Sequence, residues 1–314
     1  MATDYLICFV WDYGLKIHRD DMILPISIVI PAYNEAPAIL ETIDEITRVC
    51  KAAGIKTYEI IVVNDGSTDQ TADILSSTQV VQINHPHNIG YGRSLKDGIK
   101  KAQYDTIVIT DADCTYPFDQ VPLMLSEYQQ GFDMIVGART GRHYQESLLK
   151  SPLRHILRLI VQFAAERKIP DINSGLRIFS KIKITPMLSR LCNTFSFTTS
   201  MTLGFMMSGF FVKYINIPYH ERRGKTKVRL LKDSLRTLQY ILQAINYYNP
   251  IKLFLLFMGL CLSLSCLFFI VALMTHLKTL FAFGVGTALS GLMVLCFGLL
   301  ADLLKQMIGK QIDM

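Results

Sequence analysis

Two long stretches near the C-terminus contain no charged residue, and they constrain the fold of this chain more than any other feature. They cover residues 253–275 and 279–301, with only 276–278 between them. At about 1.5 Å rise per residue, each stretch would span roughly 35 Å as a helix, enough to cross a bilayer core. Small residues suited to close helix packing lie in the second stretch: Gly284, Gly286, Ser290 and Gly291. Soluble core helices of this length normally keep a polar face, so the pattern predicts a transmembrane helical hairpin.

Basic residues indicate how this hairpin is oriented. They crowd residues 222–252, and Lys305 and Lys310 follow the second stretch, whereas the connector carries one lysine. The positive-inside rule then places the N-terminal domain and both termini in the cytoplasm, at the inner or plasma membrane if the protein is bacterial. The formal net charge of +6 fits an anionic membrane surface better than nucleic acid, for which the chain has no motif.

Two acidic motifs mark the N-terminal half of the chain. V-N-D-G-S-T-D (63–69) and D-A-D (111–113) each follow an apolar run rich in β-branched residues. Such runs predict buried parallel strands, and ligands bind at the carboxyl ends of strands in open α/β sheets. Asp111 and Asp113 are two residues apart, so both carboxylates can face one hard cation, whose ligands are oxygens. The motif therefore predicts a Mg²⁺ or Mn²⁺ ion that holds the diphosphate of a nucleotide-activated donor.

A third strand and loop precede these motifs. Residues 26–31 form an apolar run, and A-Y-N-E (32–35) would be the loop at its carboxyl end. A helix is expected over about 37–53. Pro37 suits its first turn, and Gly54 suits its C-terminal cap.

Taken together, the motifs resemble those of the family-2 glycosyltransferases. The matching segments are V-I-P-A-Y-N-E (29–35), V-N-D-G-S-T-D (63–69), N-I-G-Y-G (88–92), D-A-D (111–113), G-A-R (137–139), D-I-N-S-G-L-R-I-F (171–179) and E-R-R-G-K-T-K (221–227). The resemblance covers roughly residues 25–300. Within the family the chain is similar to the polyprenyl-phosphate glycosyltransferases, the group that includes dolichyl-phosphate mannose synthase. A lone D-x-D is common by chance, but seven motifs in the family's order are not.

The resemblance implies an α/β fold. Its main part would be a GT-A nucleotide-sugar-binding domain with a Rossmann-like mixed sheet, followed by amphipathic interface helices and the transmembrane hairpin. The expected parts are an N-terminal extension that matches nothing in the family (1–24), the GT-A domain (25–220), a basic acceptor loop and interface helix (221–250), the hairpin (251–302) and a cytoplasmic tail (303–314). The extension is expected to be dispensable or not native.

On this resemblance, the donor site draws on several loops. The donor-binding residues expected are Pro31, Tyr33, Glu35, Asp65, Asp111, Asp113 and Arg139. The residue matching Asp65 contacts the nucleobase in the family, and the one matching Arg139 contacts the donor phosphates. Plainer alternatives are a helix-start charge for Glu35 and a surface arginine for Arg139. The expected catalytic residues are Asp113, Arg139 and Arg222, and the donor would be a UDP- or GDP-linked sugar.

The segment E-R-R-G-K-T-K resembles the family's R-x-G-x-S-K acceptor signature, with Thr226 where serine is usual. Cations around a glycine can cradle a phosphate, and a polybasic strip facing lipid headgroups is the alternative. The acceptor-binding residues expected are Ser174, Arg177, Arg222, Lys225, Thr226 and Lys227. Basic amphipathic stretches at 152–168 and 231–245 suit helices in the membrane interface, with core packing as the alternative.

The acceptor also bears on the mechanism. A polyprenyl phosphate is already anionic, with a second pKa of about 6, so no base on the enzyme is required. We therefore expect inversion at the sugar carbon by direct displacement. Asp171 is the best remaining carboxylate if a base exists, but an orienting role beside Ser174 and Arg177 fits it better.

Other functions remain open from the sequence. One is a glycosyltransferase acting on a saccharide or another lipid, and another is a non-catalytic membrane scaffold, which the intact D-A-D argues against. A processive polysaccharide synthase is disfavoured, because its Q-x-x-R-W signature needs a tryptophan and the only one is Trp11. Whether the protein forms a homo-oligomer is open.

Overall fold

The computed structural model describes residues 24–141, 159–163, 165–221 and 230–312. The chain divides into two compact units, Met1–Thr237 and Leu238–Met314. They are described separately below.

The first unit is built on a seven-stranded sheet with the order β3-β2-β1-β4-β6-β5-β7. The strands are β1 (Ile26–Ala32), β2 (Tyr58–Asn64), β3 (Val81–Asn84), β4 (Thr106–Ile109), β5 (Met134–Thr140), β6 (Arg177–Ser180) and β7 (Val212–Pro218). Strands β3, β2, β1 and β4 run parallel, whereas β6 is antiparallel to both β4 and β5. This mixed sheet confirms the predicted fold class. Because β1, β2 and β4 are parallel neighbours, their carboxyl ends meet at one edge, where the predicted loops follow.

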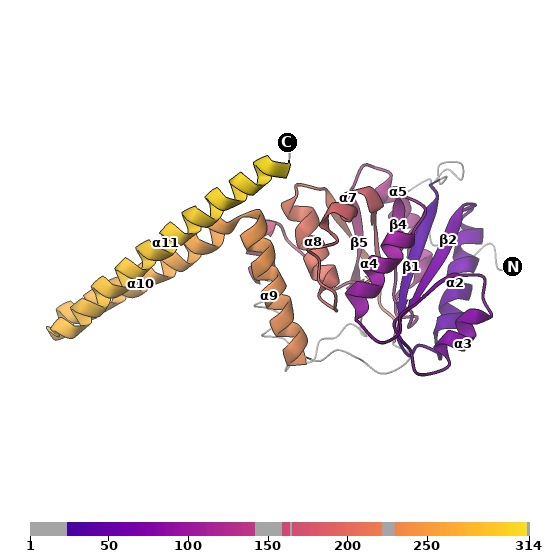
Figure 1. The fold of residues 1–314 in the computed structure, drawn as a ribbon, viewed down its shortest axis with the longest axis horizontal. Helices are drawn as coiled ribbons and strands as arrows, with labels where there is room; N and C mark the ends of the chain where they lie inside the picture. The colour runs from indigo at the N-terminus through magenta and orange to yellow at the C-terminus, as the bar shows by residue number, and fades with distance from the viewer. Residues whose placement is uncertain (1–23, 142–158, 164, 222–229, 313–314) are drawn as a thin grey trace. The chain divides into compact units, whose positions relative to one another are not determined.

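Helices cover both faces of this sheet (Figure 1). They are α2 (Ile39–Ala52), α3 (Thr71–Ser76), α4 (Tyr91–Lys101), α5 (Val121–Tyr128), α7 (Lys181–Ile184) and α8 (Phe197–Met207), with short 3-10 turns at Phe118–Gln120 and Thr185–Met187. Alternate strand residues face opposite sides, as strand geometry requires. Ile28 and Ile30 pack with α2 and α5, while Val29 and Val63 pack with α4 and α8. The result is a three-layer α/β/α core.

Helix α2 begins close to where the sequence predicts it. Pro37 lies in the turn before the helix rather than in its first turn, so the predicted start is two residues early. Gly54 follows the helix with φ of +73°, and its N–H donates to the Lys51 carbonyl. A left-handed glycine that satisfies a terminal carbonyl is the expected C-terminal cap.

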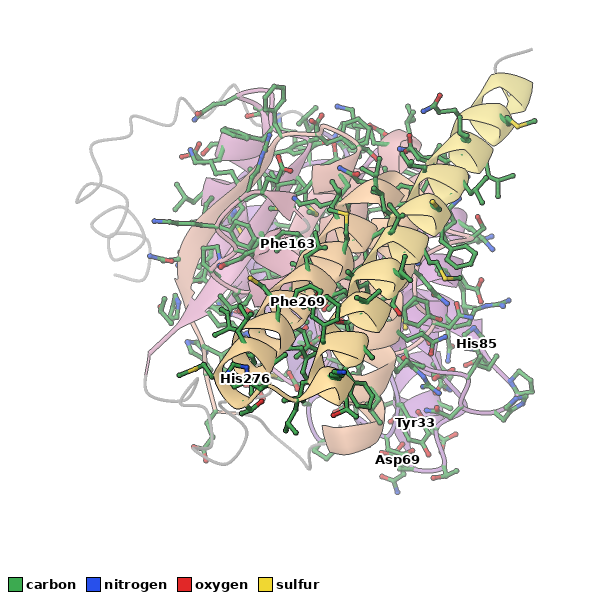
Figure 2. All side chains as sticks on the ribbon, turned by 90° about the vertical axis from the view of Figure 1, so that its left-hand side faces the viewer. Tyr33, Asp69, His85, Phe163, Phe269 and His276 are labelled. Atoms are coloured by element: carbon green, nitrogen blue, oxygen red, sulfur yellow. The ribbon has the colours of Figure 1, made fainter. Side chains whose placement is uncertain are left out.

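The second unit contains two antiparallel helices, α10 (Pro250–Thr275) and α11 (Lys278–Ile312), joined at His276 (Figures 1 and 2). Helix α9 (Leu230–Tyr248) precedes them and spans the boundary between the units. Both α10 and α11 are long and apolar enough to cross a membrane, with mean hydropathies of 2.6 for α10 and 2.1 for Lys278–Met307. Large apolar side chains on their outer surfaces are exposed, as a lipid-facing surface requires. These features indicate a membrane protein.

Glycines let α10 and α11 approach closely. Three of them, about two helical turns apart, line the contact on α11: Gly284, Gly291 and Gly298. A Cβ atom at any of these would lie 2.5–3.0 Å from a side chain of α10. Ser265 Oγ donates across the contact to the Gly284 carbonyl (2.7 Å). Gly286 faces open space and Ser290 bonds within its own helix, so the expectation that these two pack against α10 is wrong.

Candidate functional site

The loops after β1 and β2 are joined by hydrogen bonds at the carboxyl edge of the sheet. Asn34 N donates to Ser67 Oγ (3.0 Å), and Asn34 Oδ1 accepts from Thr68 N (2.8 Å). Ala36 N donates to Asp69 Oδ2 (3.2 Å). Asn34 has φ of +52°, a left-handed conformation that asparagine tolerates better than most residues. These bonds fix the backbone on either side of Glu35, and Figure 2 shows Tyr33 and Asp69 at the same end of the sheet.

Asp65, the predicted nucleobase contact, is 3 % exposed and held by three donors. Its Oδ1 lies 2.7 Å from His85 Nδ1 and accepts from Ile89 N (3.0 Å), while Oδ2 accepts from Gly90 N (2.8 Å). The other ring nitrogen of His85 lies 3.3 Å from the Asp97 carboxylate. Asp65 is therefore fixed in orientation by the N-I-G-Y-G segment and by a histidine that the sequence analysis did not assign.

The glycines of N-I-G-Y-G allow a distant segment to pack against the start of α4. A Cβ at Gly90 would lie 2.8 Å from the Asn193 carbonyl oxygen, and one at Gly92 would lie 2.4 Å from that of Cys192. Gly90 also has φ of +126°, which only glycine adopts readily. Lys96 Nζ donates to Asn193 Oδ1 (2.7 Å), tying the same segment to α4. The motif thus holds residues 192–195 beside the carboxyl edge of the sheet.

A pocket of about 600 Å³ lies between these segments. Its lining includes four of the predicted donor residues: Pro31, Tyr33, Glu35 and Asp65. It also includes three residues that the sequence analysis left unassigned to the donor: Tyr91, Phe195 and Arg236. The rings of Tyr91 and Phe195 stack, with centroids 5.7 Å apart and planes at 17°. The D-A-D carboxylates and Arg139 are not among the residues that line this pocket.

The D-A-D follows β4, and hydroxyl groups orient both of its carboxylates. Tyr91 OH donates to Asp111 Oδ1 (2.9 Å). Asp113 is 4 % exposed, and its Oδ1 accepts from Thr115 Oγ1 (2.6 Å) and Thr115 N (3.2 Å). Burial and the neighbouring Asp111 carboxylate raise the pKa of Tyr91 well above its usual value, so the phenol stays protonated and donates. Tyr91 therefore connects the pocket lining to the predicted metal ligands.

The backbone of D-I-N-S-G lies against the Asp111 carboxylate. A Cβ at Gly175 would come within 2.9 Å of Asp111 Oδ1, and Gly175 N donates to Tyr116 OH (2.6 Å). No group of three or more His, Cys, Asp or Glu side chains that could hold a metal occurs among the described residues. Two carboxylates, completed by phosphate oxygens and water, are nevertheless a common way to bind Mg²⁺ at phosphate sites. The residues present therefore fit a divalent ion shared with a diphosphate.

Arg139 and Asp171 form a two-point ion pair. Arg139 Nε lies 2.7 Å from Asp171 Oδ2, and its Nη2 lies 2.9 Å from Oδ1. Asn173 N also donates to Asp171 Oδ1 (3.1 Å), and the guanidinium lies over the Tyr219 ring. Burial alone would raise the pKa of Asp171, but the hydrogen bonds and charge of Arg139 outweigh it and hold that pKa below its usual value. A carboxylate so stabilised is a weak base, and its contacts are those of a residue that orients Arg139.

Ser174 and Arg177, predicted to bind the acceptor, are both fully buried. Arg177 donates to the Ser174 carbonyl (2.9 Å) and to Thr202 Oγ1 (2.7 Å), while Ser174 Oγ donates to the Gly137 carbonyl (2.5 Å). Burial lowers the pKa of Arg177. Both side chains support the D-I-N-S-G segment from inside, so contact with an acceptor would require this segment to move.

Several predicted features lie outside the described residues. These are the N-terminal residues 1–23 and the acceptor residues Arg222, Lys225, Thr226 and Lys227. Of the amphipathic stretch at 152–168, the structure describes 159–163 and 165–168. The roles proposed for these residues stay predictions.

The mixed α/β sheet carries a pocket and the D-A-D at its carboxyl edge, where open α/β sheets bind ligands. The sequence profile described as "Glycosyl transferase family 2" matches residues 27–198. This chain therefore belongs to glycosyl transferase family 2.

Curated relatives include undecaprenyl-phosphate 4-deoxy-4-formamido-L-arabinose transferases of Salmonella paratyphi B and Salmonella newport. Each is 28% identical over 169 residues, which are 52% of this chain and 51% of the relative. The chain thus spans about half the length of the curated relatives that it matches.

Solved structures of the same fold include glucosyl-3-phosphoglycerate synthase from Mycobacterium tuberculosis. Its complex with phosphoglyceric acid superposes with a TM-score of 0.58 at 19% identity, covering 73% of this chain and 85% of that one. Its complex with Mn²⁺, UDP and phosphoglyceric acid superposes with a TM-score of 0.56 at 20% identity, covering 70% and 78%. At this identity the likeness establishes the fold.

Proposed function

We propose that this protein is a membrane-bound, inverting glycosyltransferase that moves a sugar from a nucleotide-sugar donor to a polyprenyl phosphate, such as undecaprenyl or dolichyl phosphate. The observation that carries the proposal is the position of Tyr91 between the pocket and the D-A-D. This residue lines the pocket that contains Asp65, and its hydroxyl holds Asp111 of the D-A-D. A nucleobase subsite and a diphosphate subsite are thereby linked through one side chain.

The donor half of the proposal rests on Asp65 and the D-A-D. Asp65 is held by three donors, so its carboxylate is pre-oriented for a base that offers an N–H group. A Mg²⁺ or Mn²⁺ ion held by Asp111 and Asp113 would neutralise the departing diphosphate. The Mycobacterium tuberculosis synthase of the same fold was solved with Mn²⁺ and UDP, which favours UDP over GDP as the first nucleotide to test.

The acceptor half rests on the sequence and on the relatives. The relatives are named for transfer to undecaprenyl phosphate, and the basic segment at 221–227 carries the acceptor signature. A phosphate acceptor is already anionic and attacks without a base on the enzyme. The lowered pKa of Asp171 agrees with this, because a carboxylate stabilised as an anion is a poor proton acceptor.

The orientation of the protein follows from its basic residues. Lys and Arg flank the two spans on the side of the glycosyltransferase domain, so this domain would face the cytoplasm. Protease added to sealed inside-out vesicles should then cleave the domain, whereas protease added to right-side-out vesicles should leave it intact. The reverse pattern would contradict the orientation.

The test of the function is a transfer assay with purified protein in detergent micelles. UDP- and GDP-sugars are supplied in turn with undecaprenyl phosphate, dolichyl phosphate or a soluble saccharide, and the product is identified by mass spectrometry. Formation of a glycosyl-phospholipid that EDTA abolishes supports the proposal. Transfer to the saccharide in preference to lipid phosphate would favour the alternative acceptor class. If the protein neither transferred nor hydrolysed any of the donors, a non-catalytic scaffold would be favoured.

A further inference from the structure

Arg236 enters the pocket from a part of the chain that the family profile does not cover. The profile ends at residue 198, yet Arg236 lines the same pocket as Asp65 and Tyr91. It belongs to α9, the helix that leads from the predicted acceptor segment to the first span. A helix expected only to lie in the membrane interface therefore contributes a cation to the donor pocket.

The beginning of α9 is attached to the wall of this pocket. Thr237, the neighbour of Arg236, shares a short hydrogen bond with Ser196, with the two hydroxyl oxygens 2.6 Å apart. Ser196 is 3 % exposed and directly follows Phe195 in the wall. That wall is in turn tied to α4 through Lys96 and Asn193. Arg236 is thus carried on a helix that is attached to the pocket wall at the next residue.

The charge of Arg236 is available to a ligand. It forms no hydrogen bond or ion pair with any residue in the described part of the chain, and its side chain is half-buried. Asp65, a carboxylate in the same lining, is already held by three donors of its own. Glu35 is the other carboxylate of the lining, and it forms no ion pair with Arg236. A half-buried guanidinium that pairs with neither carboxylate is suited to binding an anion, and its fork geometry matches phosphate oxygens.

We propose that Arg236 binds a substrate phosphate group in this pocket, so that α9 contributes a residue to the substrate site. The inference rests on the proposed function, since it assigns a residue to the same site. The nucleotide and the lipid acceptor both present phosphate oxygens to the guanidinium, and the two measurements below distinguish these sources.

Titration calorimetry in the absence of any acceptor tests whether the phosphate bound by Arg236 is that of the nucleotide. UDP and uridine are titrated into the full-length protein and into the variants Arg236→Ala, Arg236→Lys and Arg48→Ala. Arg48 is an exposed arginine on α2 and controls for the lost charge. A charge-assisted contact predicts a roughly tenfold to hundredfold weaker UDP affinity for Arg236→Ala, partial recovery with lysine, and unchanged uridine affinity. If the unaltered protein prefers GDP, then GDP and guanosine replace the two probes.

Steady-state transfer kinetics at saturating donor test whether the phosphate bound by Arg236 is that of the lipid acceptor. If UDP affinity is unchanged but the KM for undecaprenyl phosphate rises by a similar factor only in the Arg236 variants, the phosphate is that of the lipid. Unchanged nucleotide affinity and unchanged lipid KM would overturn the inference. Equal losses for UDP and uridine would also overturn it, because a phosphate contact is absent from uridine.

Thermal unfolding of each variant identifies any loss of affinity or activity that is caused by misfolding. A failure of the proposed acceptor would look different from a failure of this inference. In that case the unaltered protein would bind UDP but transfer nothing to lipid phosphate, and the calorimetric comparison would still decide the role of Arg236.

Discussion

The two acidic loops of the glycosyltransferase domain share one local contact pattern but differ in their long-range partners. In each loop an aspartate accepts from the amide and hydroxyl of the threonine two residues on. After β2, Asp69 accepts from the backbone amides of Ala36 and Thr71 and from the Thr71 hydroxyl. After β4, Asp111 accepts from the Tyr91 hydroxyl, and Asp113 accepts from the hydroxyl and amide of Thr115. The first loop is thus tied to the backbone of the neighbouring loop through Ala36, while the second is tied to the pocket lining through the Tyr91 side chain.

This difference indicates which loop has mainly a structural role and which takes part in the reaction. A carboxylate that satisfies backbone amides cannot be removed without leaving buried or partly buried donors unpaired, which costs stability. The Tyr91 hydroxyl, in contrast, orients Asp111 from the pocket lining, and hydrogen-bonding partners fix metal ligands in this manner. Substitutions in the β4 loop should therefore affect activity, and those at Asp69 should affect stability.

The largest effect is expected at Asp111. Asp111→Asn keeps the size of the side chain but removes one of the two negative charges proposed to hold the metal. Transfer should fall on the order of 10³-fold or more, as should transfer by the unaltered protein in EDTA. Asp119→Asn, at an exposed position just after the same loop, is the matched control and should stay active. Full activity of Asp111→Asn in the presence of chelator would remove the metal from the mechanism.

Tyr91→Phe should produce the next largest effect. The substitution removes only the hydroxyl that donates to Asp111, and the stacking of the ring on Phe195 is kept. Loss of such an orienting partner typically weakens metal affinity or activity by roughly 10- to 100-fold. The half-saturating Mn²⁺ concentration for transfer should rise, while uridine affinity stays unchanged. Tyr58→Phe, at the far end of β2, serves as the control; an equal loss there would mean that the effect is not specific to Asp111.

How far the sequence predicts these loops depends on the range of the contacts involved. The strands and the D-A-D are local patterns, and the structure has them where the patterns indicate. The role of Gly90 and Gly92 depends on residues 192–195, about a hundred positions away, so no local pattern could reveal it. The same is true of Arg236, whose helix was predicted only as an amphipathic element. Asp69 Oδ1 accepts from the first amide of α3, a local contact, whereas Asp69 Oδ2 accepts from Ala36 N of the neighbouring loop, which no local pattern could reveal.

The transmembrane hairpin shows a different limit on what the sequence can predict. The sequence identifies both helices from length and composition, because few other structures tolerate such stretches. Which small residue faces the partner helix depends on the rotation of each helix about its axis, and composition does not encode that rotation. This is why Gly284 and Gly291 were predicted correctly but Gly286 was not, and why Gly298 and Ser265 were missed.

Asp171 offers a smaller and more informative effect. Its ion pair with Arg139 and its lowered pKa predict that Asp171→Asn retains turnover within about tenfold, as an orienting residue should. A pKa lowered by folding means that the ionised form contributes stability above the usual aspartate pKa of about 3.9, and this contribution is lost as pH falls through the folded value. The loss of stability caused by the variant should therefore be largest at neutral pH and should shrink as the pH falls below about 3.9. Complete loss of turnover, with folding and UDP binding intact, would make Asp171 the base.

The smallest effect on activity is expected at Asp69, and it tests the other side of the comparison. Asp69→Ala removes the acceptor for two backbone amides and should lower the free energy of unfolding by about 1–3 kcal/mol, toward the lower end because the loop is partly exposed. Transfer measured well below the unfolding midpoint should change less than about threefold, because the D-A-D is held by other donors. Asp73→Ala, an exposed aspartate in the first turn of α3, is the control and should cost well under 1 kcal/mol. If Asp69→Ala instead abolished transfer while the protein stayed folded, the loop after β2 would take part in the chemistry, and the long-range partners of the two loops would not distinguish their roles.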